Sequence, residues 1–98
     1  MKDLQISPIR LYVQTSLSHV IHMQERGLVS DDLLQNALLY SRLALHRANL
    51  LPDSELSSKI RPAESELAYS YSCNSSNDVL LHYIGNARRS LESSLKLL

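Results

Sequence analysis

The chain has 98 residues with ten basic and ten acidic side chains, so its formal net charge is zero. This length suits one hydrophobic core, so we expect a single domain over 1–98 without a deep, separately walled active site. With two glycines and no Phe or Trp, the composition argues against a β-sandwich or barrel and favours an all-α fold.

The first predicted helix covers about 8–26. Ser7 is suited to cap it, and Pro8 suits the first helical position, where its missing N–H costs nothing. Apolar residues keep helical spacing up to Gly27, which can adopt the left-handed conformation of a Schellman cap. Because a short connection follows, the sequence predicts an antiparallel hairpin with the next helix.

The second predicted helix, over about 31–50, has the clearest helical period in the chain. Ser30 is a good N-cap, and Asp31 and Asp32 place negative charge where the helix dipole favours it. Pro52 cannot continue the helix and pushes the residue before it out of helical angles. The broad apolar arc indicates neighbours on two sides, so we expect this helix to be central in a bundle.

The third predicted helix covers about 54–72. Its apolar period continues through Pro62, so the segment is either one helix kinked at that residue or two pieces. We favour a break, because an interior proline costs about 3 kcal/mol or more.

The fourth predicted helix covers about 77–97 and follows the polar loop 72–77. Ser75, Ser76 or Asn77 can cap its first turn. Together the four segments predict a small antiparallel helical bundle of about four helices.

Leucine-rich helix faces suggest that the chain acts by binding protein. The fourth helix carries an apolar seam to its last residue, and more leucine surface is present than a core of this size easily covers. We therefore predict a non-enzymatic interaction module: an adaptor, a chaperone, an inhibitor or immunity-type protein, or a regulatory subunit. Its partner is a foreign protein or a second copy in a homo-oligomer. The predicted partner-binding residues are Leu39, Leu43, Leu80, Ile84, Leu91, Leu95 and Leu98.

A second hypothesis is a small helical nucleic-acid-binding regulator or nuclease, although the balanced charge disfavours nucleic acid. Arg42 and His46 lie one helical turn apart and could hold phosphate and move a proton. The segment RLALH resembles the arginine–histidine motif of HEPN-type ribonucleases but is one residue shorter. The predicted anion contacts are Arg42, Arg47, Arg88 and Arg89.

A third hypothesis is a metal-binding or phosphotransfer bundle. His19 and His22 stand three residues apart with Glu25 three further on, so they could offer ligands to a divalent ion. Because no motif supplies the remaining ligands, we predict no metal, no cofactor and no catalytic residue.

The lone Cys73 excludes an internal disulfide framework and fits a reducing compartment. The first ten residues lack the apolar core of a secretory signal, and no apolar run approaches the ~18 to 20 residues that span a bilayer. We therefore predict a cytoplasmic protein without membrane contact or an evident small-molecule substrate.

Overall fold

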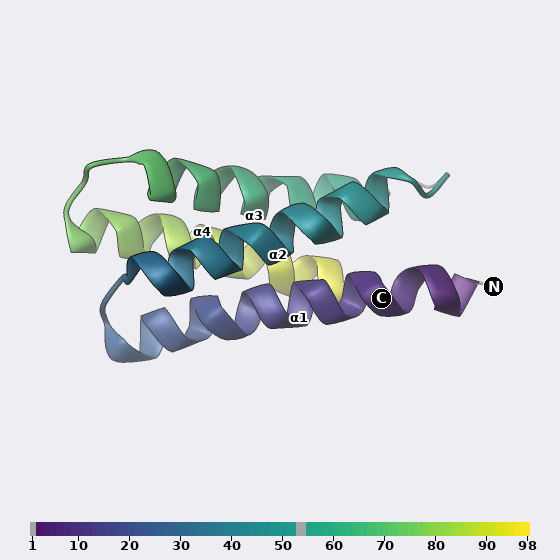
Figure 1. Cartoon of the computed structure of the whole chain (residues 1–98), viewed down its shortest axis with the longest axis horizontal. Helices are drawn as coiled ribbons and strands as arrows, with labels where there is room; N and C mark the ends of the chain where they lie inside the picture. Colours follow the sequence, from purple (N-terminus) through teal and green to yellow (C-terminus); the bar gives the residue numbers. More distant parts are fainter. Residues whose placement is uncertain (1, 53–54) are drawn as a thin grey trace.

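Four helices form the structure, a computed structural model that describes the backbone of residues 2–52 and 55–98 and the side chains from residue 6 on. The helices are α1 (Lys2–Arg26), α2 (Asp31–Asn49), α3 (Glu55–Ser72) and α4 (Asn77–Leu95). Each contacts the two beside it in a ring, and the ring closes where α4 meets α1 (Figure 1). The bundle measures 44 × 19 × 19 Å. The predicted all-α bundle is therefore confirmed.

The connection between α1 and α2 begins with the predicted Schellman cap. Gly27 has a φ of 64°, in the left-handed region that favours glycine. Its N–H donates to the carbonyl of Gln24 at 3.1 Å, and the N–H of Leu28 donates to the carbonyl of Met23 at 3.2 Å. These two bonds satisfy carbonyls that the helix end leaves unpaired and turn the chain back along α1.

Serine side chains cap the first turns of α2 and α4. Ser30 Oγ accepts from the N–H of Leu33 at 3.2 Å at the start of α2. Ser76 Oγ accepts from the N–H of Val79 at 3.4 Å at the start of α4. Of the three candidate caps for α4, the structure uses Ser76.

Asn77 instead ties the start of α4 to the α1–α2 connection. Its Oδ1 accepts from the N–H of Val29 at 2.9 Å, and its Nδ2 donates to the carbonyl of Gly27 at 3.0 Å. One side chain therefore satisfies a backbone donor and an acceptor that lie outside the helices, and it fixes the same end of the bundle at two connections (Figure 1).

Pro52 follows the end of α2 as predicted, but Pro8 and Pro62 do not bound helices. Pro8 lies inside α1, which already includes Lys2, so the predicted start at residue 8 and the cap by Ser7 are wrong. The proline removes only the bond to the carbonyl four residues earlier, near the beginning of the helix. Residues on both sides of Pro8 continue the helix.

The break favoured at Pro62 is also wrong, because α3 is one helix from Glu55 to Ser72. Ile60 and Ala63 are fully buried on either side of Pro62, whereas Pro62 itself is exposed. The carbonyl that loses its N–H partner belongs to the exposed Ser58, where solvent can hydrate it. The predicted start of this helix at residue 54 lies outside the described residues.

The core combines large aliphatic side chains with many small residues. Ser16 Oγ donates to the carbonyl of Ala37 at 2.7 Å, which joins α1 and α2 inside the core. Among the described side chains, no buried polar atom lacks a hydrogen-bond partner, as expected of a well-packed interior. The buried apolar residues are Ile9, Val13, Leu17, Val20 and Met23 in α1, Leu34, Ala37, Leu38, Ala44 and Ala48 in α2, Leu56, Ile60, Ala63 and Leu67 in α3, and Ile84, Ala87 and Leu91 in α4.

Candidate interaction surface

The predicted leucine seam of α4 lies in the core. Ile84 and Leu91 are completely buried among the helices of the chain itself. Leu95 and Leu98 are partly buried and pack against the same core, and Leu80 is also partly buried. The near-heptad apolar residues of α4 therefore face the core of the bundle. They do not form a surface that is open to a partner.

The predicted leucines of α2 lie on the outside of the bundle. Leu39 is 49% exposed and Leu43 is 36% exposed. Leu50, which caps the end of α2, is 71% exposed. These three residues are four and seven positions apart, so they follow one line along the helix.

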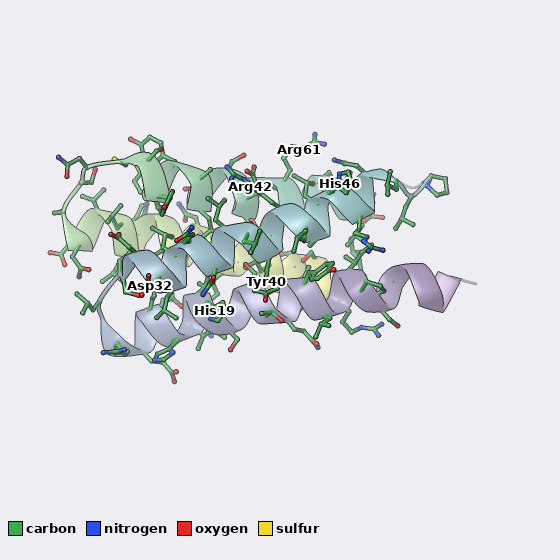
Figure 2. All side chains as sticks on the ribbon, viewed as in Figure 1. His19, Asp32, Tyr40, Arg42, His46 and Arg61 are labelled. Carbon is green, nitrogen blue, oxygen red and sulfur yellow. The ribbon has the colours of Figure 1, made fainter. Side chains whose placement is uncertain are left out.

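Six residues at alternating spacings of four and three form this line, which we call the α2 outer stripe. The members of the α2 outer stripe are Asp32, Asn36, Leu39, Leu43, His46 and Leu50, and all six are exposed. Acidic residues stand in the first turn of α2, and His46 and Arg47 stand in its last turn. Figure 2 shows Asp32 and His46 near opposite ends of the helix. The stripe therefore begins with an acidic residue, has leucines at its centre and at its C-terminal end, and is flanked at that end by Arg47.

Three rings pack beside the stripe where α1 faces α2. The ring centroid of Tyr40 lies 6.2 Å from that of Tyr12 and 6.2 Å from that of His19. All three side chains are partly buried, and Figure 2 shows His19 and Tyr40 between the two helices. The rings cover the junction of α1 and α2, and aromatic contacts of this kind add to the stabilisation from burial.

The structure does not bring the predicted anion contacts together. Arg42 Nε lies 3.0 Å from Glu64 Oε1, which links α2 to α3. Arg88 Nε lies 3.4 Å from Glu92 Oε2, and its Nη1 donates to Gln24 Oε1 at 2.8 Å. Among the described residues α2 and α4 make no contact and stand at opposite corners of the ring. The arginines of these two helices therefore face different sides.

Arg89 lies on a different surface, in a shallow depression of about 270 Å³ between α3 and α4. Its guanidinium donates to Asn86 Oδ1. The depression is lined by Ser58, Lys59, Pro62, Arg89, Ser90 and Ser93. Sequence reasoning missed this grouping because its two cations lie 30 positions apart on separate helices.

The two histidines of the metal hypothesis have different surroundings. His19 contacts the ring of Tyr40, whereas His22 is exposed and lines an open depression of about 510 Å³ on α1 together with Glu25. Among the described side chains of residues 6–52 and 55–98, no three His, Cys, Asp or Glu are grouped so that they could hold a metal ion. The other two histidines, His46 and His82, belong to α2 and α4.

A hydroxyl and thiol cluster at the α3–α4 connection was not predicted. The ring centroids of Tyr69 and Tyr83 lie 4.9 Å apart at an interplanar angle of 68°. Hydrogen bonding with Cys73, and next with Tyr83, raises the pKa of Tyr69 to about 12. Cys73 Sγ lies 2.6 Å from Ser75 Oγ. No helical spacing could have found this pair, because Tyr69 lies in α3 and Cys73 lies just beyond the end of α3, in the α3–α4 connection.

Exposed leucines recur at helical spacing on the α2 outer stripe, whereas the other large exposed apolar side chains of the described surface are scattered. The scattered residues are Leu11, Leu28, Tyr69, Tyr71, Val79 and Leu97. None of the described helices combines the length and the apolar character needed to cross a membrane. Comparison with protein-family models, with curated proteins and with solved structures finds no match.

Proposed function

We propose that the protein is a non-enzymatic helical interaction module that binds a protein partner through the α2 outer stripe. The observation that carries the proposal is the exposure of Leu39, Leu43 and Leu50 along one line of a helix whose opposite face is packed. Aligned apolar side chains with polar neighbours suit the apolar face of another helix. An adaptor, a chaperone, an inhibitor and a regulatory subunit would all use such a surface.

The energy available at the stripe is moderate. Burying an exposed leucine completely contributes roughly 1.5 to 3 kcal/mol, and about half of Leu39 is already covered by its own chain. Three such side chains can therefore support a specific but reversible contact, with the charges in the first and last turns of α2 setting its orientation. Reversible binding is what an adaptor or a regulatory subunit needs.

The nucleic-acid alternative has weaker support. A phosphate at Arg42 would have to displace the carboxylate of Glu64, which lies 3.0 Å from the guanidinium. The arginines of α4 face another side of the bundle, so they cannot add to a site at Arg42 and His46.

Site-specific photocrosslinking tests the proposal in cells that produce the protein naturally. A benzoylphenylalanine at Leu43 should give a covalent adduct of defined mass. The same residue at Val79, which is 42% exposed on α4, is the matched control and should not give that adduct. The captured protein should then bind the purified chain, and Leu43→Asp should abolish this binding while the circular dichroism spectrum stays helical.

Two outcomes would contradict the proposal. The first is that Leu39, Leu43 and Leu50 yield no adduct, with a second copy of the chain or with any other protein. The second is that the captured protein binds the Leu43→Asp variant as well as it binds the natural chain.

A further inference from the structure

The α2 outer stripe is nearly symmetric about position 41. Leu39 and Leu43 lie at equal distances from this position along the helix, as do Asn36 and His46. The fixed charges of α2 have opposite signs on the two sides of this point, with Asp31 and Asp32 in the first turn and Arg47 in the last. A second helix with the same stripe, running in the opposite direction, would therefore set Leu39 against Leu43 and Asn36 against His46, while Leu50 would lie at the level of Asp32.

We infer that a second copy of this chain occupies the α2 outer stripe, with the two α2 helices antiparallel. This inference rests on the proposed function and identifies its partner. Each Leu39 then faces the partner's Leu43, and each Asp32 lies opposite the partner's Leu50, within one helical turn of the partner's Arg47. The contact has a two-fold axis at position 41, so every interaction occurs twice, as in the isologous interfaces of most homodimers.

The charge distribution favours the antiparallel arrangement over the parallel one. In a parallel pair, Asp31 and Asp32 would lie against the same two residues of the partner, and the basic ends would also meet. Like charges held this close repel, whereas the antiparallel pair replaces both repulsions with attractions.

The size of the contact indicates a dimer that dissociates on dilution. The 19 residues of α2 span about 28 Å, and one helix pair covers less than the roughly 800 Å² per partner of a standard interface. The leucines at its centre are already partly covered by their own chain. We therefore expect monomer and dimer to coexist at micromolar concentrations.

Sedimentation equilibrium of the purified chain, over concentrations from about 5 to 500 µM, tests the inference. The natural chain should pass from monomer to dimer. Leu39→Ala and Leu43→Ala should each weaken dimerisation about tenfold or more, because each substitution removes apolar contact twice in a symmetric dimer. Leu43→Asp should abolish dimerisation, and the control Val79→Asp should dimerise like the natural chain.

Charge exchange tests the antiparallel arrangement without changing a leucine. Asp32→Lys should weaken the dimer, because it places lysine beside the partner's Arg47. Arg47→Glu should weaken it for the equivalent reason, and the variant that carries both substitutions should regain the lost affinity. Circular dichroism of the same samples checks that each variant stays folded.

A chain that stays monomeric at 500 µM would overturn this inference, and so would a dimer that survives Leu43→Asp. Failure of the double variant to regain affinity would overturn the antiparallel pairing. The two proposals are tested separately, since a foreign protein crosslinked at Leu43 by a monomeric chain would contradict the self-association and leave the proposed function standing.

Discussion

At the residue scale, we expect Gly27→Ala and Gly85→Ala to change the free energy of unfolding in opposite directions. Gly27 has a φ of 64°, and nothing lies within 4 Å of a Cβ built there, so Gly27→Ala should lose about 1 to 2 kcal/mol through the backbone alone. Gly85 is helical, and its Cβ would meet Gln24 Nε2 at an ordinary 3.5 Å, so Gly85→Ala should gain up to about 1 kcal/mol. Urea denaturation measures both changes. A neutral or stabilising Gly27→Ala would contradict the assignment of Gly27 as the helix cap.

Tyr69 provides a second prediction at this scale. Hydrogen bonding with Cys73 and Tyr83 raises its pKa from 10.0 to about 12, so the folded state favours the protonated phenol. Its contribution to stability is therefore complete below pH 10 and is lost as the pH rises toward 12. Cys73→Ala should move the ionisation of Tyr69 toward pH 10, because it removes the largest cause of the shift.

The measurement is a difference absorbance titration between each protein and its Tyr69→Phe counterpart, which isolates this phenol among the five tyrosines. The pair made in the Cys73→Ala background gives the shifted midpoint. An unchanged midpoint would show that the Cys73 thiol does not raise the pKa of Tyr69.

At the scale of the helix, local signals predicted most boundaries, including the end of α2 before Pro52, but failed at Pro8 and Pro62. The cap of Ser30 and the left-handed Gly27 act within one turn of sequence, so the residues themselves reveal them. The cost of Pro62 is also local, but the burial of Ile60 and Ala63 that offsets it depends on α2 and α4. Propensity alone therefore predicted a break that tertiary packing removes.

Pro62→Ala tests the continuity of α3. Alanine restores an N–H to the carbonyl of Ser58 and improves helix propensity at an exposed position, so the variant should gain about 2 kcal/mol in unfolding free energy. Pro52→Ala is the control, because Pro52 lies between α2 and α3 and should give no such gain. Guanidinium denaturation compares the two variants. A neutral or destabilising Pro62→Ala would mean that a helix begins at this proline.

At the scale of the whole molecule, the sequence could not separate core leucines from surface leucines. Leu43 and Leu91 each stand in a regular apolar pattern on a capped helix. Which pattern turns inward depends on the ring of four helices, because every helix has two neighbours and one outer side. Contacts such as that between Asn77 and Val29 also join residues 48 positions apart, and no local spacing predicts them.

We therefore expect Leu91→Ala to destabilise the fold more than Leu43→Ala does. Leu91 is completely buried, so Leu91→Ala should lose about 2 to 5 kcal/mol of unfolding free energy through lost transfer energy and the cavity that remains. Leu43 is 36% exposed and should lose less, because solvent and side chains can fill the space. Unfolding by urea at nanomolar concentration, where the proposed dimer would have dissociated, separates folding from association.

Association should reverse the order of the two variants. At a concentration where the natural chain dimerises, Leu91→Ala should retain the dimer as long as it is folded, because its side chain lies inside each copy. Leu43→Ala should lower the dimer fraction seen by light scattering although it is the more stable variant. Equal destabilisation by the two substitutions would place Leu43 in the core, and the α2 outer stripe would then lose the residue at its centre.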